Sequence, residues 1–232
     1  MRVDVYVDVL CPWCFIGKRR LDAALAGLDE RSCVQTRWRS YELDPHASRI
    51  PGATAAEHMA EPDWWGDRAP AKIAHIRSVG AAEALELNLH LARPVNTFDA
   101  HRLSHWAAIH GRADAVMERL FLAYHTEGLN IADLRVLERL GVEAGLDATE
   151  ARAVLASDAY ALEVRADERR GYELGVTSVP TLVIGSGTRV SGVQPSAALR
   201  RQLQDAVTAI RDSSPGQRER APQRRSGLTH RR

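Results

Sequence analysis

The apolar positions of this chain alternate like a strand at both ends and repeat like a helix between them. Valine occupies positions 3, 5, 7 and 9, which predicts a strand over residues 3–9. Leu21, Leu25 and Leu28 follow at helical spacing, and residues 34–39 alternate again. The first 40 residues therefore predict a β-α-β unit with parallel strands.

Residues 52–174 show helical periodicity and no convincing strand. Stretches with an apolar stripe fall at 71–84, about 99–109, 113–124, 134–144, 150–156 and about 160–174. Asp99, Asp133 and Thr149 precede or open three of these stretches and are the predicted N-caps. We expect this block to form an all-helical insertion.

Strand character returns near the end of the chain. Residues 181–184 and 188–191 flank a Gly-Ser-Gly turn and predict an antiparallel hairpin, followed by a helix over about 196–210. The order β-α-β, helical block, β-β-α predicts an α/β thioredoxin fold with a large all-helical insertion. The expected domains are a discontinuous thioredoxin-like domain over 1–51 and 175–212, a helical insertion domain over 52–174 and a tail over 213–232.

Composition separates the tail from the rest of the chain. Residues 213–232 hold six Arg and one Glu and are rich in Pro, Gly, Ser and Gln, which predicts disorder. A basic tail can bind nucleic acid, but a solvated tail without a nucleic-acid partner is the favoured interpretation. No apolar run approaches the roughly 18 residues that a membrane-spanning helix needs. The first residues also lack the pattern of a signal peptide, so we expect a cytoplasmic protein with no membrane partner.

The strongest chemical signal is the segment Cys11-Pro12-Trp13-Cys14, which lies where the first strand gives way to a helix. Free N–H groups and a partial positive charge at a helix N-terminus favour the thiolate, the reactive form of cysteine. Pro12 suits the first helical turn because it has no N–H to lose. We expect Cys11 to be the exposed nucleophile and Cys14 the more buried resolving thiol. Trp13 packs beside them or is an ordinary surface aromatic.

The cysteine pair has three other interpretations. A zinc site would need Cys33 and a histidine as further ligands, and no spacing in the sequence supports it, so no metal is expected. The pair could also be inert buried thiols or a structural disulfide, which is rare in the cytosol. Cys33 is predicted to be a small buried residue, with a regulatory mixed disulfide as the alternative.

A second signal is Val179-Pro180, directly before a predicted strand. We expect this bond to be cis, with an ordinary trans proline at the start of a strand as the alternative. A cis bond would face the Val179 backbone towards Cys11, where it can bind an extended substrate. Asp8 is predicted to cap the helix or lie in solvent, with proton transfer to a thiol as the alternative. Trp64 and Trp65 are predicted to anchor their loop, or else to contact substrate as a lid.

Four polar residues gather at the start of a predicted helix, namely Asn96, Asp99, His101 and Arg102. We expect a helix cap with interdomain hydrogen bonds; the alternative is that they line a groove between the insertion and the thioredoxin-like domain.

The segment Cys11-Pro12-Trp13-Cys14-Phe15-Ile16-Gly17, with Asp8 three residues before it, resembles the DsbA-like thioredoxin-domain proteins, and within them the FrnE-like subgroup. Further similarity occurs in residues 38–43, 96–102, 124–131, 175–184 and 191–195, so the resemblance covers about 3–210. It implies a thioredoxin fold with a helical insertion, a redox C-x-x-C and a cis-proline loop. Cys33 and the Arg-rich tail lie outside the family pattern. The related isomerases of 2-hydroxychromene-2-carboxylate and kappa-class glutathione transferases typically carry Ser where this chain has Cys11.

These observations predict a thiol–disulfide oxidoreductase that exchanges disulfides with protein or small-molecule thiols. We expect no cofactor, with glutathione left open as a co-substrate and a homodimer left open as the assembly. One alternative is a glutathione-dependent isomerase or transferase acting on a small aromatic or polyketide-like molecule. Another is a non-enzymatic redox sensor or chaperone-like binder.

Overall fold

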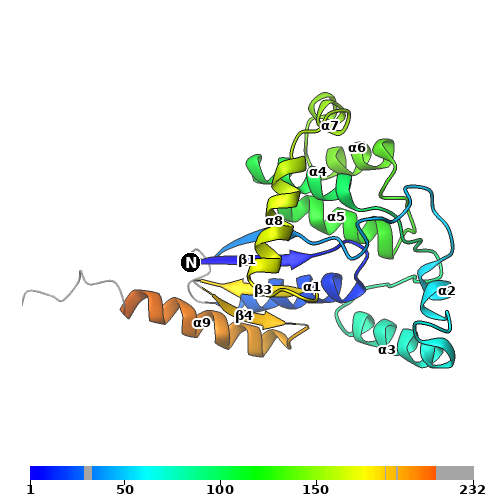
Figure 1. Ribbon diagram of the computed structural model, residues 1–232. Coiled ribbons are helices and arrows are strands. Elements are labelled where there is room, and N and C mark those ends of the chain that lie inside the picture. Colours follow the sequence, from blue (N-terminus) through cyan, green and yellow to red (C-terminus); the bar gives the residue numbers. More distant parts are fainter. Residues whose placement is uncertain (29–32, 186, 192, 213–232) are drawn as a thin grey trace, which may run out of the picture.

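A single four-stranded sheet forms the centre of the computed structural model, which describes residues 1–28, 33–185, 187–191 and 193–212. The strands stand in the order β2-β1-β3-β4 (Figure 1), and they are β1 (Arg2–Val7), β2 (Gln35–Ser40), β3 (Thr181–Ile184) and β4 (Thr188–Ser191). β1 pairs parallel with β2 and antiparallel with β3, and β3 pairs antiparallel with β4. This is the predicted thioredoxin fold.

The remaining elements are helical, as the periodicity predicts. They are α1 (Pro12–Ala26), α2 (Ala55–Met59), the 3-10 helix η2 (Gly66–Arg68), α3 (Ala69–Ala82), α4 (Phe98–Ile109), α5 (Ala113–His125), α6 (Leu134–Glu143), α7 (Ala148–Leu155), α8 (Ala161–Glu173) and α9 (Ser196–Asp212). No residue between 52 and 174 lies in a strand, and all of them are described.

Two of the three predicted caps are wrong. Asp133 does cap α6, and its carboxylate accepts a hydrogen bond from the Arg135 amide. α7 is capped by Asp147 rather than Thr149, because helical backbone already begins at Ala148. α4 follows Thr97, so Asp99 lies inside its first turn.

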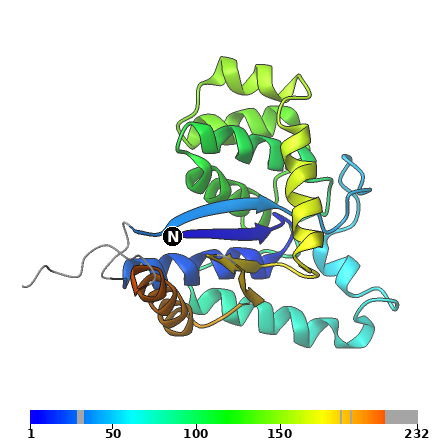
Figure 2. The same ribbon diagram turned by 60° about the vertical axis from the view of Figure 1, so that its left-hand side comes forward.

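The alternation along β1 separates two faces of the sheet. Val3, Val5 and Val7 are buried on the face that packs against α1 and α9. Asp4 and Tyr6 lie on the opposite face, which α8 covers (Figures 1 and 2). α8 therefore belongs structurally to the sheet, although the sequence places it in the helical block.

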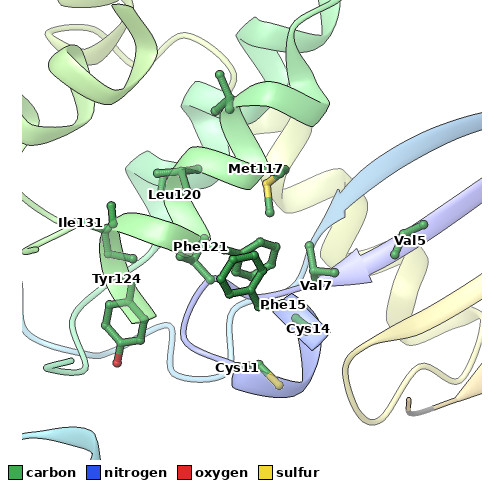
Figure 3. Packing of buried hydrophobic residues seen from close by; sticks show 14 of the residues in the cluster. Val5, Val7, Cys11, Cys14, Phe15, Met117, Leu120, Phe121, Tyr124 and Ile131 are labelled. Carbon is green, nitrogen blue, oxygen red and sulfur yellow. The ribbon is translucent and has the colours of Figure 1, made fainter. Parts of the chain in front are cut away.

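One hydrophobic core runs from the sheet into the helical block. Phe15 of α1 stacks on Phe121 of α5, with 5.2 Å between ring centroids (Figure 3). Val7 lies on one side of this pair and Leu120 on the other, in the same buried cluster. The helical block is thus bound to the sheet by continuous apolar packing.

The Arg-rich tail over 213–232 lies outside the described residues, so its predicted disorder stays a prediction. Within the described part of the chain, no helix is long and apolar enough to cross a membrane.

Candidate active site

The first turn of α1 holds both cysteines of the motif. Cys11 is the N-cap residue, with extended φ and ψ of −85° and 112°, and its side chain makes no capping hydrogen bond. A short turn after β1 leads into it, closed by the Cys11 amide donating to the Asp8 carbonyl at 3.2 Å. Pro12 occupies the start of the helix, where no N–H is required. The helix N-terminus therefore lies at the Cys11 sulfur (Figure 3).

Both cysteines are free thiols in this structure, and neither is fully open to solvent. Cys11 is 7% exposed and Cys14 is 1% exposed. Cys14 is the more buried thiol, as the sequence predicts. The prediction of an exposed Cys11 is wrong, because the loop before β3 lies against its sulfur.

The Val179–Pro180 peptide bond in this loop is cis. The Cys11 thiol donates a hydrogen bond to the Val179 carbonyl, with 3.5 Å between sulfur and oxygen. Two segments 168 residues apart in the sequence are thus brought together.

Gly17 allows α1 to approach this loop. A Cβ at position 17 would lie 3.0 Å from Cγ of Pro180. Sequence reasoning did not assign a role to Gly17, although a glycine within a predicted helix is a signal of close packing.

The environment of Cys14 opposes its ionisation. Burial raises the pKa of the Cys14 thiol well above its usual value, and a hydrogen bond with Cys11 and the charge of Cys11 raise it further. A backbone hydrogen bond from Asp8 acts in the opposite direction, while the Asp8 carboxylate again raises the pKa. Cys14 is therefore protonated at neutral pH and needs a base before it can attack a disulfide.

Asp8 is completely buried, so the prediction of a helix cap or an exposed side chain is wrong. One carboxylate oxygen accepts a hydrogen bond from the Leu43 amide at 2.7 Å, and the other accepts one from the Leu10 amide at 3.4 Å. The second oxygen also lies 3.6 Å from Nε2 of His101 on α4. The chain after β2 and the helical block together enclose this carboxylate.

Two buried residues of α5 complete the surroundings of Asp8. Burial raises the pKa of Tyr124, and the Asp8 charge adds to this effect. Burial lowers the pKa of His125 to about 4, although Asp8 and the backbone of Val9 and Cys11 act in the opposite direction. Sequence reasoning missed both residues, because at the end of an apolar helical stripe they have the appearance of ordinary core positions.

Trp13 is half-buried and tilts against His75 of α3, with 5.9 Å between ring centroids. Further along the same surface, Trp65 packs on the core and Lys72 lies over its ring at 4.8 Å. Trp64 contacts Trp65 edge-on and is largely exposed. The anchoring role therefore belongs to Trp65.

Of the four polar residues at the start of α4, three make structural contacts and one faces the cysteine site. Asp99 pairs with Arg49 and with Arg102, which also donates to backbone carbonyls at the end of α7 and before α8. Asn96 accepts a hydrogen bond from the Phe98 amide and so supports the helix start. Only His101 reaches the cysteine site.

Cys33 is exposed, and the prediction that it is buried is wrong. It precedes β2, which runs parallel to β1, so it lies at the opposite end of the sheet from Cys11. Cys33 therefore cannot complete a zinc site with the motif cysteines. Among the residues that the structure describes, no group of three or more His, Cys, Asp or Glu side chains could hold a metal ion.

Comparisons with known proteins identify the family of this chain. The family model of the DSBA-like thioredoxin domain matches residues 2–204. The uncharacterized protein YwbO of Bacillus subtilis is 27% identical over 210 residues, which cover 90% of this chain and 96% of that protein.

Among solved structures, the probable DsbA oxidoreductase SCO1869 from Streptomyces coelicolor is 36% identical, with a TM-score of 0.84 and 90% of each chain covered. A 2-hydroxychromene-2-carboxylate isomerase shares the fold at 17% identity, with a TM-score of 0.69 over 92% of this chain and 100% of its own. The match of the family model to nearly the whole described chain shows that this protein belongs to the DsbA-like thioredoxin-domain family, which is of the oxidoreductase type.

Proposed function

We propose that this protein is a thiol–disulfide oxidoreductase that works through the Cys11–Cys14 pair. The observation that carries the proposal is the Cys11 thiol, which lies at a helix N-terminus and 3.5 Å from the Val179 carbonyl. This arrangement gives one sulfur an anion-stabilising position and a backbone surface for an extended substrate. The similarity to a probable DsbA oxidoreductase supports it.

The chemistry balances over two exchange steps. The Cys11 thiolate attacks a substrate disulfide, one substrate thiolate leaves and takes up a proton, and a mixed disulfide remains. Cys14 then loses its proton and attacks the Cys11 sulfur, which forms the Cys11–Cys14 disulfide and releases the second substrate thiol. The substrate gains two electrons and the protein loses two. The reverse sequence oxidises a substrate dithiol, and the reduction potential of the pair decides the direction.

Asp8 is the proposed proton acceptor for Cys14. Its carboxylate is buried and its charge raises the pKa of the Cys14 thiol, which supports this assignment. Pro12 and Trp13 shape the approach to Cys11, and Val179 and Pro180 receive the substrate backbone.

Three serine substitutions test the assignment. We expect Cys11→Ser to lower the rate of disulfide exchange by about 100-fold or more, because the nucleophile is lost. We expect Cys14→Ser to accumulate a mixed disulfide that mass spectrometry detects. Cys33→Ser is the matched control and keeps wild-type rates. Full activity in Cys11→Ser would rule out the mechanism.

We propose a cytoplasmic protein with no metal or organic cofactor, and glutathione as its small-thiol partner. The presence of both cysteines favours exchange over the isomerase alternative. Calorimetry with reduced glutathione, run on wild type and Cys11→Ser, tests this part. If glutathione gave no heat of binding with either protein, it would be ruled out as the small-thiol partner. Protein disulfides would then remain as the proposed substrates.

A further inference from the structure

A line of buried polar side chains leads away from Asp8 through the helical block. His101 of α4 is 2% exposed, and its Nε2 atom lies 3.6 Å from Asp8 Oδ1. No hydrogen-bond partner within the described residues reaches this nitrogen. A buried imidazole nitrogen without a partner is costly and calls for an explanation.

Glu42 lies near Asp8 and the start of α4, because the next residue, Leu43, donates its amide to Asp8 and Asn96 donates to the Glu42 carboxylate. Its side chain is fully buried, and burial raises its pKa, while the charge of His101 lowers it. Glu42 also accepts hydrogen bonds from Asn96 at 3.4 Å and from Arg165 of α8. Arg165 is 42% exposed, so the line that begins at Asp8 ends at solvent.

Other charged and titratable groups face the same region from each neighbouring element. α5 contributes Tyr124 and His125, and α1 contributes Cys14. α8 contributes Glu168, which shares Arg165 with Glu42.

His125 is poorly placed to pass a proton from Asp8 to solvent. Apart from Asp8, only the backbone of Val9 and Cys11 acts on its pKa, and burial keeps the ring neutral down to about pH 4, where its lowered pKa lies. Arg102, next to His101 in sequence, is held by Asp99. Of the two histidines beside Asp8, His101 has the connection to solvent.

We propose that His101 and Glu42 carry the proton released by Cys14 from Asp8 to solvent during the step that resolves the mixed disulfide. This inference rests on the proposed function. The Cys14 S–H proton passes to the Asp8 carboxylate, and Asp8 passes it to Nε2 of His101. The imidazole releases a proton from its other nitrogen towards Glu42, which returns it to water beside Arg165. No electrons move in these transfers.

The contact between Asp8 and His101 needs a small adjustment. The 3.6 Å between Asp8 and His101 must shorten by roughly half an ångström to form a hydrogen bond. Catalytic hydrogen bonds are often long in a free enzyme and tighten when the reacting complex forms. His101 and Glu42 act through Asp8 and are therefore positioning residues.

A two-phase kinetic experiment on the full chain separates this inference from the proposed function. A chromogenic aryl disulfide releases one coloured thiolate when Cys11 attacks and a second when Cys14 resolves the mixed disulfide. Stopped-flow traces across neutral pH then give the two rates separately. The Cys33→Ser background removes the third thiol.

The variants are His101→Gln and Glu42→Gln, with His105→Gln as the matched control. His105 lies one turn further along α4 and bonds Ser40 and Asp167 instead of Asp8. We expect an unchanged first phase and a second phase about 10-fold slower in both test variants, because a positioned proton-transfer group is removed. We also expect the pH profile of the second phase to move to higher pH. The control keeps both phases.

Loss of the first phase in the wild-type protein would contradict the proposed function itself. A normal first phase, with second-phase rates and pH profiles unchanged in both test variants, would overturn the proton path. Equal slowing of both phases, with the pH profile unmoved, would assign the two residues a purely structural role and would also overturn it.

Discussion

Gly17 lies where α1 approaches the loop that carries Val179 and Pro180. A methyl group at this position would lie 3.0 Å from the Pro180 ring, which is rigid and has to move by a few tenths of an ångström. We expect Gly17→Ala to lower the free energy of unfolding by about 1 kcal/mol through overpacking. We also expect the exchange rate of Cys11 to fall by roughly 3- to 10-fold, because the substrate-binding backbone moves away from the sulfur.

Urea unfolding and the disulfide exchange assay measure the two effects of Gly17→Ala. Gly52→Ala is the control, because a Cβ at position 52 meets nothing within 4 Å. A disulfide exchange rate in Gly17→Ala equal to that of the wild type would show that the loop tolerates the added methyl group.

His125 makes stability depend on pH. Its pKa in the folded protein is about 4, below the usual value of 6.5, so the folded state binds fewer protons than the unfolded state. Its contribution is fully present above pH 6.5 and is lost as pH falls towards 4. At 1.36 kcal/mol per pKa unit, about 2 kcal/mol should be lost between pH 7.5 and 5.

Urea unfolding of wild type and His125→Phe at both pH values measures this contribution. Phenylalanine keeps the stacking on Phe15 and Phe121 but cannot titrate, so the pH dependence should shrink by that amount. His75→Gln, at an exposed ring, should keep the wild-type dependence. An equal pH dependence in His125→Phe would show that other groups account for the loss.

At the scale of elements, α7 has two candidate N-cap residues, Asp147 and Thr149. The Asp147 carboxylate accepts a hydrogen bond from the Glu150 amide at 2.9 Å, whereas Thr149 lies inside the helix. We expect Asp147→Ala to destabilise the protein by about 1 kcal/mol. Thr149→Ala should change stability little, because alanine is a good helix former. Thermal unfolding of the two variants decides between them, and a larger effect at Thr149 would contradict the observed helix start.

The elements themselves could largely be predicted from the sequence, because alternation and helical periodicity report directly on which side of a segment is buried. Two of the three caps could not; Asp99, for example, lies inside the first turn of α4 and pairs there with Arg49 and Arg102. Arg49 lies on another segment of the chain, and the local sequence around Asp99 contains no information about it. The same limit applies to α8, whose packing on the sheet depends on tertiary contacts.

At the scale of the whole molecule, the sequence predicts the two cysteines of the site but not the buried residues that surround them. Cys11 and Cys14 lie on one helical turn, so their spacing alone predicted their proximity. Asp8, His101 and His125 come together only because α4 and α5 pack against the turn that follows β1. No periodicity or motif links these three positions, and for that reason the sequence favoured a helix cap or an exposed side chain for Asp8 over proton transfer to a thiol.

The continuous core predicts that the sheet and the helical block unfold together. Val5 of β1, Phe15 of α1 and Phe121 of α5 belong to one buried cluster, so opening the block would expose the apolar face of the sheet. In native-state hydrogen exchange with increasing urea, the most protected amides of β1 and α5 should converge on one global unfolding free energy with one urea dependence. If α5 exchanged with a smaller urea dependence while β1 stayed protected, the helical block would be a separate folding unit. The contact between Phe15 and Phe121 would then contribute little to the stability of the turn that holds Cys11.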